Sequence, residues 1–303
     1  MQTRKVALWI AVFALSGPLC AALAAQQPLP SPQDLIRDIS YNELQDRDRD
    51  SRWQYRSERV TSAQNVVREQ IETNDGPVFR ILAENGTPLD PAQQQREQRR
   101  LDQYVHDPAE MARVERDHEE DEARIATVLK LLPQAFLFSY QGVPAGDTVR
   151  IAFRPDPAFA PSGFEARVLH AVSGSLIANV RYKRLIEIHG TVDQRVDFGY
   201  GLLGHIEKGS SFDIHREQVS PTHWKADLVA AHIQGKLLLF KTISQDQRET
   251  RSDFRPVPVD TTPSEAEQWL RQGSTQSNRA SEGIPDAMRE SAHPVEARLN
   301  RAQ

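Results

Sequence analysis

Strand-forming segments follow one another between residues 135 and 244, with only a few residues between successive segments. A connection between parallel neighbours needs about a dozen residues or more, so gaps this short favour antiparallel pairing. This part of the chain therefore predicts one long antiparallel meander. Its expected strands cover residues 135–141, 148–154, 164–172, 176–188, 191–199, 211–219, 223–233 and 237–244.

The same plan extends towards the N-terminus. Residues 53–60, 64–72 and 78–84 are β-prone runs separated by turn clusters. A helical insert over residues 90–132 then precedes the meander, and it consists of two consecutive helices. The middle of the second helix, from Glu115 to Arg124, is almost entirely charged. We therefore expect this helix to cross solvent midway, to dock by its C-terminal end and to stop at Pro133.

Four helix starts share one arrangement: a capping side chain, a first-turn proline and a polar group at the third position. A capping side chain accepts hydrogen bonds from backbone N–H groups that have no partner in the first turn. We expect helices to begin at each of these pairs. They are Ser31-Pro32, Asp90-Pro91, Asp107-Pro108 and Thr262-Pro263.

Apolar and polar residues alternate along several of the expected strands, which indicates a sheet with one apolar and one solvated face. A sheet of this length must cover its apolar face by curling or by receiving helices. The predicted fold class is α+β: a strongly curved antiparallel β-sheet, or unclosed β-barrel, with helices covering its mouth. The residues from Gly273 onwards lack periodicity and are expected to form a disordered tail.

The alternation also selects a set of side chains for the buried face of consecutive strands. The default interpretation of such side chains is a packed core, and the functional one is an apolar ligand pocket. We expect the set to line a single interior that accepts an acyl chain when the helices beginning at Asp90 and Asp107 move aside. The set is Phe153, Val168, Val172, Phe198, Phe212, Ile214, Trp224 and Leu228.

The first 24 residues have the three parts of a secretory signal peptide. Arg4 and Lys5 supply the positive start, residues 6–15 are apolar, and Ala22-Leu23-Ala24 forms a small-x-small cleavage site. The alternative is an uncleaved anchor over residues 6–23, although Ser16-Gly17-Pro18 interrupts that run. We expect cleavage, with the mature chain starting near Ala25 in the periplasm or cell envelope.

Charge and cysteine content exclude several classes of function. A formal net charge of −5 and a pI near 6.0 provide no basic field for a phosphate backbone, so no nucleic-acid partner is expected. Cys20 is the one cysteine and lies in the expected signal peptide. The mature chain then has no thiol for disulfide, redox or nucleophilic chemistry.

The segment Gly199-Tyr200-Gly201-Leu202-Leu203-Gly204 matches the dinucleotide-binding pattern G-x-G-x-x-G. A dinucleotide site needs a helix to open at the third glycine, so that its N-terminus holds the pyrophosphate. Residues 205–209 lead instead to another expected strand. We expect these glycines to serve a bulge or tight turn between two strands, and we expect no cofactor.

Catalytic and metal-binding patterns are also missing from the sequence. Histidines are frequent in the strand-rich half, but no pair has a metal-ligand spacing such as H-x-H or H-E-x-x-H, so no metal site is expected. The serines of Ser173-Gly174-Ser175 lack the flanks of a nucleophile elbow and are expected at a turn between strands. No catalytic residue is assigned, and a hydrolase remains the least favoured alternative.

The order of these features resembles the periplasmic lipoprotein-sorting proteins, the LolA and LolB family. The resemblance rests on an export signal, an N-terminal helix, strands, a helical insert and antiparallel strands that include residues 181–190 and 196–201. It covers roughly residues 31–258. In that family an incompletely closed β-barrel, lidded by helices, holds acyl chains in an apolar cavity. The insert here is longer and more charged than in the family pattern, and no acyl-binding position is matched residue by residue.

The sequence thus predicts a signal peptide over residues 1–24, a LolA-like half-barrel domain over 25–260, and a short helix with a disordered tail over 261–303. The expected function is non-enzymatic binding or transport of lipid, or of the acyl chains of lipoproteins. The main alternative is a structural or protein-binding envelope component whose interior is filled by its own side chains.

Overall fold

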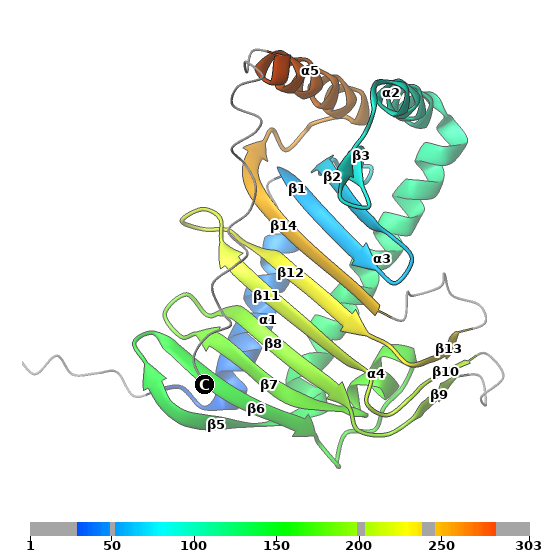
Figure 1. The fold of residues 1–303 in the computed structure, drawn as a ribbon. Coiled ribbons are helices and arrows are strands. Elements are labelled where there is room, and N and C mark those ends of the chain that lie inside the picture. The colour runs from blue at the N-terminus through cyan, green and yellow to red at the C-terminus, as the bar shows by residue number, and fades with distance from the viewer. Residues whose placement is uncertain (1–28, 49–51, 199–203, 238–245, 283–303) are drawn as a thin grey trace, which may run out of the picture. The chain divides into compact units, whose positions relative to one another are not determined.

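The computed structural model describes residues 29–48, 52–198, 204–237 and 246–282 (Figure 1). The chain divides into two compact units, residues 1–30 and residues 31–303, and the second holds every helix and strand described below. The expected signal peptide and its anchor alternative lie outside the described residues. No helix in the described ranges has both the length and the hydropathy needed to span a bilayer.

Eleven strands form one antiparallel sheet in the order β4-β3-β2-β1-β14-β12-β11-β8-β7-β6-β5. β4 and β5 are its two edges, so the sheet is not closed. A second sheet has the order β13-β10-β9. The strands of the large sheet are β1 (Arg52–Thr61), β2 (Asn65–Ile71), β3 (Val78–Glu84), β4 (Thr87–Pro88), β5 (Phe136–Ala145), β6 (Thr148–Pro155), β7 (Val172–Asn179), β8 (Arg184–Val192), β11 (Ser211–Gln218), β12 (Trp224–His232) and β14 (Asp246–Val257). Those of the small sheet are β9 (Val196–Phe198), β10 (Gly204–Ile206) and β13 (Gly235–Leu237).

Antiparallel pairing is confirmed, and the meander predicted for residues 135–244 is confirmed in part. Strands β5, β6, β7, β8, β11 and β12 are neighbours in chain order, whereas β9, β10 and β13 leave this run and form the small sheet. Strands β1 to β4 form a second run, and β14 joins the two runs by pairing with β1 on one side and β12 on the other. The sequence predicts no strand at β14. Its residues are mostly polar or charged, so the alternation that marks a half-buried strand is missing there.

Three of the predicted strands differ from those in the structure. The predicted strand 191–199 divides into the end of β8 and β9, which belongs to the small sheet. Residues 164–169 form a short helix, α4 (Phe164–Leu169), and β7 begins only at Val172. Phe164 and Val168 are spaced for a helix as well as for a strand, and both pack on the main core from α4. The predicted strand 176–188 is the end of β7, a turn with Lys183 at φ 51°, and the start of β8.

The four other helices all begin where the capping pattern predicts. They are α1 (Pro32–Asp48), α2 (Pro91–His106), α3 (Pro108–Ala135) and α5 (Pro263–Glu282). Asp90 and Gln93 form the expected reciprocal capping box, and Asp107 accepts from the first turn of α3. α3 continues through Pro133, and α5 continues past Gly273, so both predicted ends were too early. The rest of the predicted tail, residues 283–303, lies outside the described residues.

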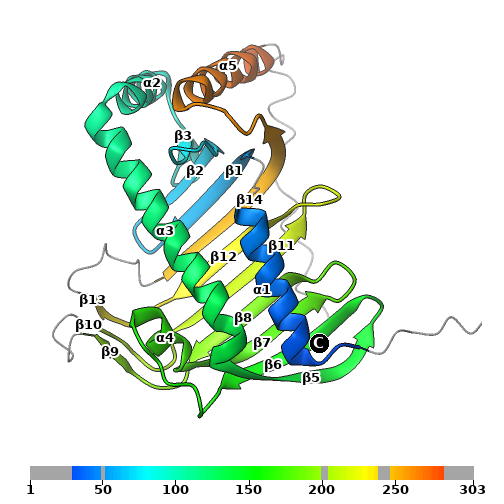
Figure 2. The same ribbon diagram turned by 180° about the vertical axis from the view of Figure 1, so that it is seen from behind.

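Helices α1 and α3 lie on one face of the large sheet, which we call the inward face (Figure 2). Three side chains of α1, Leu35, Ile36 and Ile39, join the main hydrophobic core with residues of β5 to β8. A smaller core lies at the β3 end, where α2 and α5 pack around Ile71 and Val78. The helix expected to stand apart after residue 260 is therefore part of the same compact unit.

Helix α2 also closes the open edge beside β3. β4 is only two residues long, so most of β3 has no strand partner on that side. Glu97 accepts a hydrogen bond from the backbone N–H of Ile81 at 2.8 Å, and Arg100 donates to the carbonyl oxygen of Phe79 at 2.8 Å. One helix face thus satisfies backbone groups that would otherwise pair with another chain.

Candidate functional site

One row of cross-strand partners runs over the inward face from β6 to β1. Partners in a register point to the same side of a sheet, so the row shows how that face changes from strand to strand. The first three members are buried, the next two are half-buried, and the last two are charged. The row is Ile151, Leu176, Ile188, Ile214, Val229, Glu249 and Arg59.

The middle of the row belongs to an apolar strip, which we define as Phe212, Ile214, Val229 and Ala231 on β11 and β12. Phe212 pairs with Ala231, and Ile214 pairs with Val229. All four side chains are half-buried, whereas Ile151 and Leu176 on the same face are almost completely buried. Every residue of β12 is half-buried, so neither face of this strand is fully covered. The inward face therefore carries apolar surface that the protein leaves partly open to solvent.

Next to the strip lies an arginine cluster, which we define as Arg59, Arg68 and Arg251 around Glu249. Arg59 Nη2 lies 3.0 Å from Glu249 Oε2, and Arg251 Nε lies 2.9 Å from Glu249 Oε1. Arg68 Nη2 is 3.6 Å from Oε1, and its Nε donates to the Ser57 hydroxyl at 3.0 Å. One buried carboxylate thus faces three guanidinium groups.

Aromatic rings hold two of these arginines in place. The guanidinium carbon of Arg68 lies 5.1 Å from the centre of the Phe79 ring, and that of Arg251 lies 5.5 Å from the centre of the Tyr55 ring. Such stacking fixes the plane of a guanidinium and leaves its edge available to an acceptor. The cluster is accordingly a pre-organised set of donors.

The pKa shifts in the cluster follow from burial and charge. Burial opposes ionisation of Glu249, but Arg251, Arg68 and Arg59 together outweigh it and lower the pKa of the carboxyl. Burial is also the main reason that the pKa of Arg68 is lowered; Arg59 and Arg251 add to the effect and Glu249 opposes it. The pKa of Arg251 is raised instead: burial opposes its charge, but Tyr55, Glu249 and Glu72 outweigh burial.

Helix α3 crosses this face, and α1 lies beside it (Figure 2). Its principal contacts are with α1, α2 and α4 rather than with any strand. Near its start, Val114 lies over Gly76 in the turn between β2 and β3, and near its end Leu132 packs on the main core. Ile125, seven residues before Leu132 on the same helix face, is 39% exposed. The exposure of Ile125 agrees with the expectation that α3 is solvated midway, whereas the contacts near its start show that it docks by more than its C-terminal end.

The structure brings together five of the eight side chains predicted to line the interior. Phe153 and Val172 are buried members of the main core, and Val168, Phe212 and Ile214 pack against it. Val168 does so from α4 rather than from a strand. The side chain of Phe198 lies outside the described part of the chain.

The other two predicted residues lie elsewhere. Trp224 is at the start of β12, where its ring centre is 6.3 Å from that of Tyr182. Leu228 pairs with His215, so it points to the opposite face from Val229 and does not join Ile214. Alternation from Trp224 predicts that Leu228 lies on this face, but a register shift between His215 and Arg216 interrupts that alternation. The arginine cluster has no signal in the sequence, because its members are far apart in the chain.

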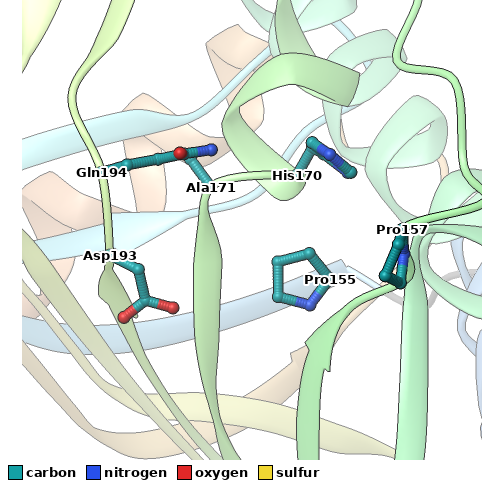
Figure 3. Close-up of a pocket in the computed structure, with 6 residues that line it drawn as sticks. All are labelled: Pro155, Pro157, His170, Ala171, Asp193 and Gln194. Carbon is teal, nitrogen blue, oxygen red and sulfur yellow. The ribbon is translucent and has the colours of Figure 1, made fainter.

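A cavity of about 290 Å³ lies where β6, β7 and β8 meet α4 (Figure 3). Its six lining residues include His170 and Asp193 but no hydroxyl or thiol. The Nδ1 atom of His170 is buried without a hydrogen-bond partner, and the ring packs beside Phe159. No Ser, Thr or Cys side chain is among the residues that line this cavity. Ser173 and Ser175 lie within β7 rather than in the predicted turn.

The histidines and the glycine motif that the sequence singles out lie on or between strands in the part of the chain that the structure describes. Three histidines on the outer face pair with aspartates of neighbouring strands: His189 with Asp213, His215 with Asp227, and His232 with Asp246. Within the described ranges, no group of three or more His, Cys, Asp or Glu side chains is placed to hold a metal ion. Strand β10 begins at Gly204, where a dinucleotide site would need a helix; residues 199–203 lie outside the described ranges.

Comparisons with protein-family models, with curated proteins and with solved structures find no match for this chain. The fold itself defines a mixed α+β protein dominated by an open antiparallel sheet of eleven strands. The resemblance to the lipoprotein-sorting family stays a prediction from the order of elements.

Proposed function

We propose that this chain is a non-enzymatic, exported envelope protein that binds or carries an acyl amphiphile on the inward face of its sheet. The observation that supports this most is that side chains become less buried along a single row of cross-strand partners on the inward face. Ile151 and Leu176 are buried beneath the helices, whereas Ile214 and Val229 in the same row remain half-buried. An acyl chain lying along the apolar strip would complete the cover that the protein lacks there.

The energetic basis is burial of alkyl surface without a covalent step. Each buried methylene contributes about 0.8 kcal/mol, so ten of them contribute on the order of 8 kcal/mol before the cost of ordering the chain. In this proposal the sheet acts as a strongly curved half-barrel and α3 acts as its movable cover. The exposure of Ile125 in the middle of α3 supports that role, since a solvated stretch is held less tightly than a buried one.

The second candidate is a structural or protein-binding envelope component with a filled interior. The main core favours it, because Phe153 and Val172 pack there as ordinary buried side chains. The two candidates differ in what they require of the apolar strip. A carrier needs the strip to accept a ligand, whereas a structural component needs only the core beneath α1.

A pair of adjacent substitutions tests the proposal. Val229 and Leu228 are both half-buried on β12 but point to opposite faces. We expect Val229→Gln to weaken binding of the neutral detergent dodecyl maltoside, measured by calorimetry below its critical micelle concentration, and Leu228→Gln to leave it unchanged. Mass spectrometry of lipid extracted from the native protein should show a co-purified acyl amphiphile. Equal effects of the two substitutions, or no binding by the unmodified protein, would favour the structural candidate.

A further inference from the structure

We propose that the arginine cluster binds the anionic head group of an amphiphile whose acyl chain lies along the apolar strip. This inference rests on the proposed function and adds the class of ligand: an acyl chain that ends in a phosphate or carboxylate group. It follows from three observations on the inward face, namely the charge of the cluster, its position beside the strip and the partial exposure of its donors.

The charge of the cluster is not balanced from within. Three guanidinium groups surround the single carboxylate of Glu249, which leaves a formal charge of 3 − 1 = +2. The nearby pair of Lys225 and Glu72, 3.2 Å apart, adds no net charge. Partly buried cations without counterions are unfavourable, so an anion placed beside them gains more than it would at an exposed site. The cluster therefore has the electrostatics of an anion-binding site.

The cluster and the strip are directly adjacent. Glu249 is the cross-strand partner of Val229 on one side and of Arg59 on the other. Direct partners in an antiparallel pair have Cβ atoms about 4.5–5.5 Å apart, so the apolar surface passes into the charged surface within one strand spacing. A ligand that lies across β11, β12 and β14 meets alkyl surface first and guanidinium groups next.

The donors remain accessible from solvent to different degrees. The side chain of Arg59 is 41% exposed and that of Arg251 is 28% exposed, whereas Glu249 is 3% exposed. Glu249 thus pairs with the arginines on their buried side, and the guanidinium groups of Arg59 and Arg251 can donate to a second anion on the solvent side. Phosphate and carboxylate groups match this geometry because a guanidinium can donate two parallel hydrogen bonds to either.

The test compares three probes by calorimetry: dodecyl phosphate, dodecyl maltoside and inorganic phosphate, with both detergents below their critical micelle concentrations. The proposal expects dodecyl phosphate to bind more tightly than the neutral detergent. Arg251→Gln and Arg59→Gln should each lower the affinity for dodecyl phosphate about tenfold, which is the usual effect of losing one charge-assisted hydrogen bond. Neither substitution should change the affinity for dodecyl maltoside. Arg248→Gln is the matched control, because Arg248 is exposed and pairs with Ala230 rather than with Val229.

Glu249→Gln separates ligand binding from a purely structural role. Removing the internal carboxylate raises the charge of the cluster, so dodecyl phosphate should bind more tightly than to the unmodified protein; a structural role would lower stability without raising affinity. If Glu249→Gln does not fold, Arg59→Gln carries the test, because Arg59 is the most exposed member.

The remaining outcomes separate this inference from the proposed function. Equal binding of the two detergents, unchanged in the arginine variants, would overturn the head-group site and leave the acyl carrier standing. Inorganic phosphate binding as tightly as dodecyl phosphate would overturn the link between cluster and strip. If neither detergent binds, the proposed function fails together with the inference.

Discussion

The same substitution at two valines measures how far the apolar strip differs from the packed core. Val149 on β6 is 4% exposed in the main core, and Val229 on β12 is half-buried in the strip. Val→Ala removes two methyl groups, worth about 1.6 kcal/mol when fully buried, and the cavity left in a packed core raises this to about 2.5 kcal/mol. At Val229 the side chain is only half-buried, so about half of the transfer free energy applies, and no closed cavity forms. We therefore expect Val229→Ala to lower the free energy of unfolding by about 0.8 kcal/mol.

Urea unfolding, followed by far-ultraviolet circular dichroism, gives both free energies from the change in midpoint at constant slope. Both valines lie in strands, so the preference of valine over alanine for strands affects both variants alike. Adding dodecyl phosphate should stabilise the unmodified protein and Val149→Ala more than Val229→Ala, since a ligand stabilises the state that it binds. A loss at Val229 as large as that at Val149 would mean that the strip is packed core, and the reasoning for a carrier would be refuted.

Three further predictions concern the sheet around the site. Burial, the largest effect, raises the pKa of Tyr55 from 10.0 to about 12. The neutral Tyr55 side chain therefore contributes to the free energy of unfolding below pH 10, and this contribution is lost as the pH rises through 12. Tyr55→Phe should remove this alkaline loss of stability, which is measured as the urea midpoint against pH. The lowered pKa of Glu249 has the opposite effect on stability. The ionised carboxylate contributes to the free energy of unfolding above the ordinary pKa of 4.5, and this contribution is lost as the pH falls through the lower pKa of the folded state. Glu249→Gln should therefore flatten the acid side of the plot of urea midpoint against pH. Glu97→Ala leaves the backbone N–H of Ile81 without its acceptor, which should lower the free energy of unfolding by about 1–3 kcal/mol. The exposed edge of β3 should then promote dimers, detected by sedimentation velocity. A variant that stays monomeric would contradict the edge-protecting role of α2.

Local signals in the sequence predicted the starts of four of the five helices that the structure describes, while α4 was predicted as a strand. Each helix start depends on a few neighbouring residues, such as the reciprocal bonds of Asp90 and Gln93, and such contacts form in the same way whatever packs around them. Helix ends were predicted less well. α3 continues through Pro133 and α5 continues past Gly273, because a residue that disfavours a helix can be outweighed by the packing around it.

The sequence also predicted the class of the sheet but not its full membership. Short gaps determine antiparallel neighbours because the chain has no room to cross over. β14 was missed because its residues are largely charged, and it is a strand only because β1 and β12 offer their backbone groups on both sides. Pairing between segments so far apart leaves no mark in either segment alone.

The sequence alone determined where α1, α2, α3 and α5 begin, that neighbouring strands pair antiparallel, and that an apolar face includes Phe212 and Ile214. Only the tertiary structure decided that Val229, and not Leu228, continues that face, because an interruption in the register of β11 and β12 reverses the alternation. It also decided where the arginines meet. Arg59 and Glu249 are 190 residues apart in the chain, and they become a charged site only because the sheet places β1 beside β14.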